Sequence, residues 1–140
     1  MKPMKPFEVK IRVRYAETDK MGYVYYGNYA TYYEVARTEL LRSLGITYRQ
    51  LEEDGYMLPI ASMQIKYIKP AFYDDLLTVR VQLKEPHPVK VDFKYEIYNE
   101  KGELLNEGST LLIFINEKNR KPTKAPEYYM KAVKKLFSDE

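Results

Sequence analysis

The chain has 140 residues, a length that fits one domain with a substantial core, and we expect a single domain over residues 1–140. Lysine and arginine outnumber aspartate and glutamate by 23 to 20, and a net charge of +3 is well short of what nucleic-acid binding needs. The chain contains no cysteine, which excludes disulfides, thiolate nucleophiles and cysteine-bound metals; its single histidine, His87, lies between two prolines, which disfavours a metal site or a Ser-His-Asp triad.

The first expected elements are a strand and a long helix joined by a polar loop. Apolar and charged side chains alternate over residues 7–15, the period-2 pattern of a strand with one face in water. After the loop of residues 16–27, Asn28 can cap a helix and Gly45 can end it. The apolar stripe of this helix recurs at helical spacing: Tyr29, Tyr33, Ala36, Leu40 and Leu44.

The rest of the helix surface indicates what surrounds it. Tyr32, Val35 and Leu41 widen the apolar surface beyond one face, so we expect the downstream strands to wrap around this helix. Charged residues off the stripe are spaced for two ion pairs: Glu34–Arg37 and Glu39–Arg42.

Two shorter helices are expected later in the chain. The first opens with a capping box that begins at Thr47 and closes at the Asp54–Gly55 pair. The second follows the basic loop of residues 118–122 and has Pro126 in its first turn.

Between these helices the apolar pattern predicts four strands. They cover residues 58–68, 77–83, 89–97 and 110–115. The first of the four has a break near Ala61 and Ser62, and a hairpin loop at residues 99–102 precedes the last. The last is apolar at every position from residue 111, as expected of a central strand covered on both faces.

This order of elements predicts an α+β fold, an antiparallel five-stranded sheet wrapped around one long helix. A single curled sheet leaves one face and one edge in need of cover, so we expect a homo-oligomer that forms through the sheet edge or the helix region. Nowhere do about 18 apolar residues run together, so we expect a cytoplasmic protein with no membrane insertion.

The loop and the helix carry a recognisable motif. Residues 15–29 read Y-A-E-T-D-K-M-G-Y-V-Y-Y-G-N-Y, and residues 33–39 read Y-E-V-A-R-T-E. Both segments resemble the signature of hotdog-fold acyl-CoA thioesterases of the 4-hydroxybenzoyl-CoA thioesterase type, especially the bacterial branch associated with the Tol–Pal envelope system. Residues 58–77 also resemble that family, and the likeness in element order covers residues 9–115. It implies a sheet wrapped around the long helix, a homodimer or homotetramer, and active sites at the dimer interface.

The resemblance implies roles for two residues. Asp19 matches the catalytic aspartate, which acts either as a nucleophile on the thioester carbonyl or as a general base for water. The backbone N–H of Tyr26 matches the donor that polarises the carbonyl oxygen. The residues themselves agree, because a helix start offers unsatisfied N–H groups where an oxyanion would develop. From the residues alone, the more common role for an aspartate in a polar loop such as Asp19 is that of a turn or capping residue.

Four further residues are candidates for substrate binding: Gly22, Tyr25, Ser62 and Lys90. Gly22 permits a tight turn and a close approach of the substrate. Lys90 is a candidate phosphate contact, since some family members place an arginine-rich cluster near this position where this chain has only scattered basic groups. Glu34 and Arg37 are interpreted as scaffold, and His87 as a surface turn residue.

The leading interpretation is an enzyme that hydrolyses acyl-CoA thioesters to a free carboxylic acid and CoA, with no cofactor and no metal. The alternative is a module that binds acyl carrier protein or lipid-synthesis partners with little turnover. RNA or DNA binding is disfavoured by the modest charge. No motif encodes the acyl group, the choice between CoA and a carrier protein, or the choice between dimer and tetramer.

Overall fold

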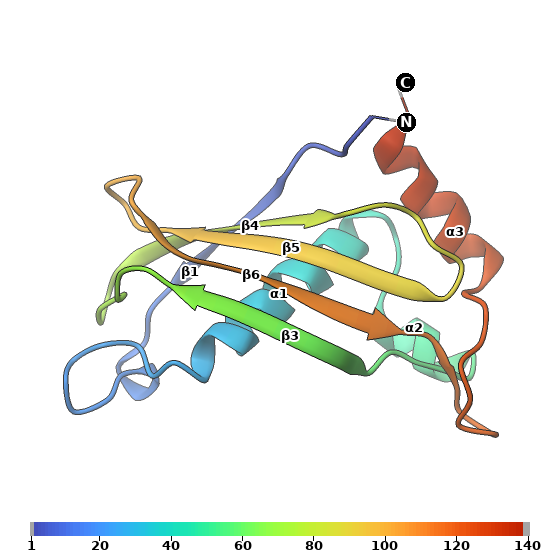
Figure 1. Cartoon of the computed structure of the whole chain (residues 1–140), viewed down its shortest axis with the longest axis horizontal. Helices are drawn as coiled ribbons and strands as arrows, with labels where there is room; N and C mark the ends of the chain where they lie inside the picture. Colours follow the sequence, from blue (N-terminus) through green and yellow to red (C-terminus); the bar gives the residue numbers. More distant parts are fainter. Residues whose placement is uncertain (1, 139–140) are drawn as a thin grey trace.

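A long helix lies across one face of a five-stranded antiparallel sheet in the computed structural model, which describes residues 2–138 (Figure 1). The elements in chain order are β1 (Phe7–Arg12), the 3-10 turn η1 (Tyr15–Glu17), α1 (Asn28–Ser43), α2 (Tyr48–Glu53), β2 (Tyr56–Met57), β3 (Ile60–Tyr67), β4 (Leu76–Leu83), β5 (Lys90–Tyr98), β6 (Leu104–Ile113), β7 (Ile115–Asn116), α3 (Glu127–Lys134) and the 3-10 turn η2 (Lys135–Phe137). The strands run in the order β1-β4-β5-β6-β3, which confirms the predicted α+β fold. Residues 1 and 139–140 of the expected domain lie outside the described residues.

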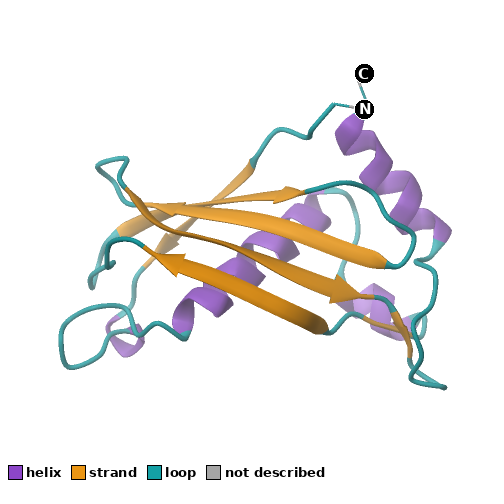
Figure 2. Cartoon of the chain, in the orientation of Figure 1, coloured by secondary structure: helices purple, strands orange, loops and turns teal. Residues whose placement is uncertain are grey.

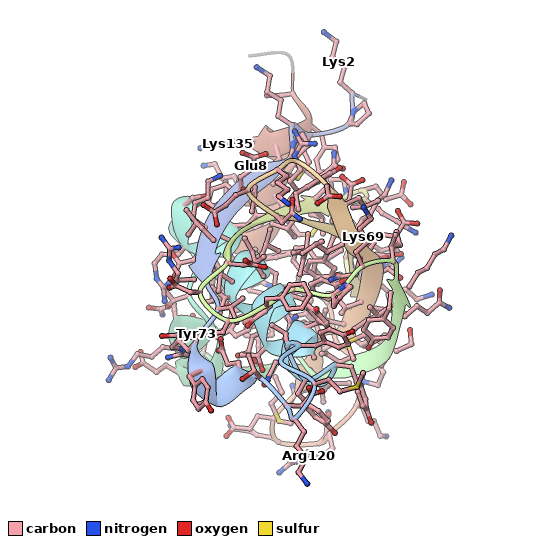
Figure 3. The ribbon with its side chains drawn as sticks, turned by 90° about the vertical axis from the view of Figure 1, so that its left-hand side faces the viewer. Lys2, Glu8, Lys69, Tyr73, Arg120 and Lys135 are labelled. Atoms are coloured by element: carbon pink, nitrogen blue, oxygen red, sulfur yellow. The ribbon has the colours of Figure 1, made fainter. Side chains whose placement is uncertain are left out.

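The sheet curls around α1, as the sequence predicted (Figure 3). Viewed from the end at which α1 begins, β1 lies on one side of the helix and β3 on the other. Figure 2 shows α3 across one end of the sheet. No helix within residues 2–138 has the length and apolar character needed to cross a membrane.

The two faces of the sheet differ in composition. Side chains alternate between buried and partly exposed along β4 and β5, so the buried set faces α1. On the outer face, charged residues stand opposite one another across all five strands: Lys66, Glu107, Glu96, Arg80 and Glu8. Arg80 Nε lies 2.7 Å from Glu8 Oε2, and the polar character of this face suits contact with water.

The contact between α1 and the sheet is close at β6. The Tyr33 ring stacks on Tyr95, with 4.1 Å between ring centroids and 3° between planes. The Tyr33 hydroxyl donates a 2.6 Å hydrogen bond to Asn106 Oδ1. A Cβ at Gly108 would lie 2.5 Å from the Gln64 carbonyl oxygen and 2.8 Å from the Tyr33 hydroxyl. Glycine is therefore required here so that helix and sheet can meet.

Burial on α1 departs from the predicted stripe at two residues. Val35 is 39% exposed, whereas the pattern predicted that it would widen the apolar surface. Arg37 is only 4% exposed, although its position lies off the stripe. Its guanidinium donates to the hydroxyls of Tyr48 (3.1 Å) and Tyr95 (3.4 Å), and these replace the water that a buried charge would lose.

The predicted ion pairs of α1 are both present. Glu34 Oε1 lies 4.0 Å from Arg37 Nη2, and Glu39 accepts a hydrogen bond from Arg42. The pairs join residues three apart, which are neighbours on a helix surface. Glu34 is exposed while Arg37 is buried, so the buried charge depends mainly on the tyrosine hydroxyls.

Several local signals are confirmed. Gly45 ends α1 with φ +82°, and Thr47 Oγ1 accepts the Gln50 N–H at 3.1 Å to cap α2. The register between β3 and β6 shifts between Ile60 and Ser62, where the break was predicted. Gly102 closes the β5–β6 hairpin with φ +78°.

Other boundaries differ from the predicted ones. Residue 27, a glycine, is the N-cap of α1, and Asn28 is the first helical residue rather than the cap. The first strand ends at Arg12, because the chain turns through η1 and leaves Tyr15 exposed. β6 begins at Leu104, six residues earlier than predicted. The apolar pattern missed the polar stretch Asn106–Ser109, which belongs to the strand because its backbone pairs with β5 and β3. Leu111 is partly exposed on its outer face, so the strand is not fully covered on both sides.

Replacing Gly108 with alanine tests the close contact of α1 with β6. The new Cβ would clash with the Gln64 carbonyl and the Tyr33 hydroxyl, so we expect Gly108→Ala to lower the free energy of unfolding by about 1 to 3 kcal/mol. Urea denaturation measures this change. The control Ser109→Ala, next along β6, should shift it by no more than about 0.5 kcal/mol. Equal stability of Gly108→Ala and wild type would contradict the packing argument.

Candidate active site

The Asp19 loop, residues 18–27, lies beside the start of α1 and the end of β3 (Figure 1). These three segments enclose an open cavity of about 340 Å³. Its walls are Asp19, Tyr23, Val24 and Tyr26 from the loop, Tyr29 from α1, Tyr67 at the end of β3, and residues 68–70 just after that strand. The structure thus brings Asp19 and Tyr26, the two candidate catalytic residues, to one cavity.

A tight turn presents the Asp19 carboxylate. Asp19 Oδ1 accepts the Met21 N–H at 2.9 Å, and the Gly22 N–H bonds to the Asp19 carbonyl at 3.0 Å. Gly22 has φ +80°, a backbone conformation that glycine adopts without strain. Asp19 is therefore a turn residue through Oδ1, while Oδ2 accepts no hydrogen bond from the described residues. One oxygen fixes the carboxylate and the other stays available.

The start of α1 has no side-chain cap. The Asn28 N–H bonds to the Tyr25 carbonyl, but in the described part of the chain the Tyr26 N–H donates to no protein acceptor. A helix start concentrates partial positive charge, and Tyr26 comes directly before the N-cap residue of α1, Gly27. The Tyr26 ring is exposed and lies against Tyr25, with ring centroids 4.6 Å apart. Tyr25 is thus a neighbour of the cavity rather than one of its walls.

Ser62 and Lys90 lie away from this cavity in the same chain. Ser62 is near the start of β3, about 17 Å along the strand from Tyr67 at a rise of about 3.3 Å per residue. Lys90 begins β5, where its N–H and that of Val89 donate to His87 Nδ1 at 2.9 and 3.0 Å. His87 therefore shapes the β4–β5 turn, and substrate contacts by Ser62 and Lys90 stay a prediction.

Two residues that the motif did not assign belong to the cavity or support it. The Tyr67 ring lies 5.8 Å from Tyr29 and 6.4 Å from Tyr26 between centroids, so the end of β3 contributes an aromatic wall. Tyr67 ends β3, and only the packing of that strand end against α1 reveals its place. The other residue is Glu17, which lies inside the motif itself.

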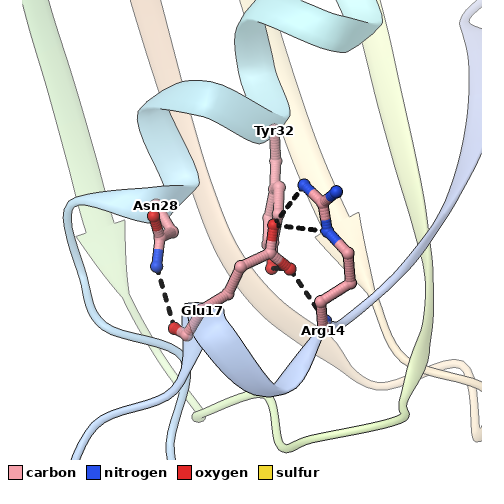
Figure 4. Close-up of polar contacts among 4 residues, drawn as sticks. All are labelled: Arg14, Glu17, Asn28 and Tyr32. Carbon is pink, nitrogen blue, oxygen red and sulfur yellow. Dashed lines mark hydrogen bonds and ion pairs between the residues drawn. The ribbon is translucent and has the colours of Figure 1, made fainter.

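Glu17 is a buried carboxylate with a full set of partners (Figure 4). Its Oε1 accepts the Arg14 N–H and the Tyr32 hydroxyl, each at 2.8 Å, and Oε2 lies 3.0 Å from the Arg14 guanidinium. Burial alone would raise the pKa of Glu17, but the hydrogen bonds from Arg14 and Tyr32 outweigh it and leave the pKa below its ordinary value. Glu17 is therefore ionised at neutral pH and already fully engaged.

The cavity combines two elements of acyl-transfer chemistry. An available carboxylate oxygen can attack a carbonyl or take a proton from water, and a free N–H at a helix start can stabilise the resulting oxyanion. Among residues 2–138, no group of three or more histidine, aspartate or glutamate side chains is placed to hold a metal ion.

Comparisons with known proteins agree with this chemistry. Residues 13–133 match the sequence profile of the thioesterase-like superfamily. YneP of Bacillus subtilis is 37% identical over 113 residues, 81% of this chain and 82% of that protein. The acyl-CoA thioester hydrolase YbgC of Escherichia coli O6:H1 is 31% identical over 121 residues, 86% of this chain and 90% of that protein.

The structure resembles a solved thioesterase over almost its whole length. The DHNA-CoA thioesterase of Staphylococcus aureus superposes with a TM-score of 0.88 at 40% identity, covering 94% of this chain and 90% of that one. The resemblance seen in the motif and the predicted fold are thereby confirmed. The chain belongs to the thioesterase-like superfamily, as a hotdog-fold enzyme of the acyl-CoA thioesterase type.

Proposed function

We propose that the chain hydrolyses acyl-CoA thioesters to a free carboxylic acid and CoA in the cavity between the Asp19 loop, α1 and β3. The observation that supports this most directly is that one cavity is lined by both Asp19, which has a carboxylate oxygen that accepts no hydrogen bond from the described residues, and Tyr26, whose N–H donates to none of them. Thioester hydrolysis needs these two groups together, because negative charge moves onto the carbonyl oxygen as the attacking oxygen approaches.

In this mechanism Asp19 Oδ2 either attacks the thioester carbonyl carbon or removes a proton from the attacking water. The Tyr26 N–H and the positive end of the α1 dipole stabilise the oxyanion of the tetrahedral intermediate. Collapse of the intermediate breaks the carbon–sulfur bond and expels the CoA thiolate. In the general-base route, the proton that Asp19 took from water passes to the thiolate. In the nucleophilic route, collapse leaves a mixed anhydride on Asp19, and water then hydrolyses it to the free acid and supplies the proton of the thiol. The Met21 N–H holds Oδ1, so it limits rotation of the carboxylate while the reaction proceeds at Oδ2.

We infer that two copies pair through the free edge of β3. β3 is an edge strand of the sheet, and apolar side chains are exposed along it and just beyond its end: Ile60, Met63, Tyr67 and Ile68. An apolar edge strand open to water invites pairing with another chain. The charged outer face offers no comparable surface within the described residues, which favours the edge over the face.

Such a pair would complete the site. In a two-fold antiparallel pairing of β3 with a second β3, the start of one strand lies beside the end of the other. Ser62 of one copy would then approach the end of β3 in the other copy, where Tyr67 borders the Asp19 cavity. This arrangement supports Ser62 as a substrate contact made across the dimer.

Replacing Asp19 with asparagine tests the reaction. The amide oxygen can still accept the Met21 N–H, but an amide neither attacks a thioester nor accepts a proton well, so kcat should fall by about 10² to 10⁴-fold. The measurement is free-thiol release from short, long and aromatic acyl-CoAs and from an acyl carrier protein thioester.

Asp74→Asn is the matched control, because Asp74 is an exposed loop aspartate that does not border the cavity and asparagine tolerates its φ of +70°. It should keep full activity. Equally negligible rates for wild type and Asp19→Asn on every substrate would refute the enzymatic proposal, and capture of the carrier protein without turnover would support a binding role instead.

The β3 edge is tested by placing a charge on it. In the dimer, Met63→Glu would bury two carboxylates between the paired strands. We therefore expect the dimer dissociation constant to rise by about 100-fold or more, with a parallel loss of thioesterase activity. Analytical ultracentrifugation over a range of concentrations measures the change. Val35→Glu, an exposed apolar position on α1, should leave the dimer intact. If the Val35→Glu dimer dissociated while the Met63→Glu dimer stayed intact, the β3 proposal would be wrong and the interface would lie on α1.

A further inference from the structure

The backbone of Glu17 closes the Asp19 loop at its base. Its carbonyl oxygen accepts two hydrogen bonds, from the Tyr25 N–H and from Asn28 Nδ2, each at 2.8 Å. Both donors come from the far end of the loop, where α1 begins. Figure 4 shows the bond from Asn28. One carbonyl group therefore joins the residue that enters the loop to the residues that leave it.

The side chain of Glu17 fastens the same point to the helix. Tyr32, one turn into α1 and 1% exposed, donates its hydroxyl to Glu17 Oε1. The Arg14 N–H and guanidinium hold the carboxylate from the strand side. Glu17 is 9% exposed, and a carboxylate at that depth is stable only when such partners are present. It thus links the end of β1, the Asp19 loop and α1.

Other hydrogen bonds of the loop shape the turn or attach it to the β3–β4 connection. The Asp19 N–H to Tyr23 carbonyl bond and the Gly22 N–H to Asp19 carbonyl bond lie inside the turn, so they set its shape without attaching it to α1. The Val24 N–H bonds to the Ala71 carbonyl, which attaches the turn to the β3–β4 connection. The end of the loop is held to the helix start by backbone bonds from Asn28 and Tyr29, whereas the beginning of the loop, next to Asp19, is attached to α1 through Glu17.

The Glu17 contacts lie close in the chain to both candidate catalytic residues. Asp19 comes two residues after Glu17, and Tyr26 comes directly after Tyr25, whose N–H the Glu17 carbonyl holds. The separation between the Asp19 carboxylate and the Tyr26 N–H thus depends on the Glu17 contacts. Displacement of reacting groups by about 1 Å can cost about 100-fold in rate.

We propose that Glu17 is a positioning residue, which holds the Asp19 loop against α1 so that the Asp19 carboxylate and the Tyr26 N–H face the cavity together. This inference rests on the proposed thioesterase function and adds to it a residue that does not touch the substrate. Glu17 is the acidic residue of the motif whose carboxylate is already saturated, whereas Asp19 keeps an oxygen available.

The test compares four variants on one acyl-CoA substrate. Glu17→Ala should lower kcat by about 100-fold while KM changes by less than about threefold, because the cavity walls remain and only the alignment is lost. Glu17→Gln should recover most of kcat, since its amide oxygen can still accept from Arg14 and Tyr32. Tyr32→Phe removes one of these donors and should lie between the two.

Tyr33→Phe is the matched structural control. Tyr33 is the next residue on α1, and its hydroxyl also makes a buried hydrogen bond, but to Asn106 on β6 rather than to the loop. It should lower the melting temperature about as much as Tyr32→Phe and leave kcat unchanged. Equal kcat for Tyr32→Phe and Tyr33→Phe, or a Glu17→Ala variant that loses stability and keeps kcat, would reduce Glu17 to a structural role.

Amide hydrogen exchange supplies a readout that needs no activity. Faster exchange over residues 18–27 in Tyr32→Phe, with β4 and β5 unchanged and Glu17→Gln close to wild type, is the expected result, and it does not depend on Glu17→Ala folding. Exchange in this segment of Tyr32→Phe equal to that of wild type would overturn the positioning role. Absence of any thioesterase activity in wild type would instead refute the proposed function, while the exchange comparison would still report on the loop.

Discussion

The structure depends on the burial of a tyrosine-rich helix inside a curled sheet. A buried hydroxyl must find a hydrogen-bond partner, and α1 has three buried tyrosines in its first two turns. Each hydroxyl contacts a different surrounding segment. Tyr29 accepts the Ala71 N–H from the β3–β4 connection, Tyr32 donates to Glu17 at the base of the Asp19 loop, and Tyr33 donates to Asn106 on β6. The helix therefore organises its surroundings through hydroxyl groups as well as through apolar contact.

The candidate site lies where α1 begins. No side chain caps the start of α1, and just before it the Tyr26 N–H donates to no acceptor among residues 2–138. Two acidic residues near it have opposite environments. Glu17 is buried, ionised and saturated with hydrogen bonds, and Asp19 is exposed with one oxygen available. One carboxylate suits structure and the other suits chemistry, although only one residue separates them in the chain.

Further along the helix, tyrosine hydroxyls also serve as hydrogen-bond partners of the buried Arg37. Its buried guanidinium meets Tyr48 from α2 and Tyr95 from β5, and Tyr95 in turn bonds to Thr110 on β6 at 2.6 Å. Burial of a charge is tolerated here because several neutral hydroxyls face it. The free edge of β3 is the contrasting feature, since the apolar side chains of Ile60 and Met63 are exposed there. In the proposed pairing, a second copy of the chain would cover them.

The sequence by itself determined the order of elements, the fold class, the glycine that ends α1, the cap of α2 and the break in β3, because these follow from local periodicity and turn chemistry. Its motif also indicated Asp19 and Tyr26, which the structure places at one cavity. Only the tertiary structure decided the burial of Arg37, the place of Tyr67 and the contacts of Glu17. Those depend on hydroxyls and rings contributed by segments distant in the chain, and no local pattern records which segment packs beside which.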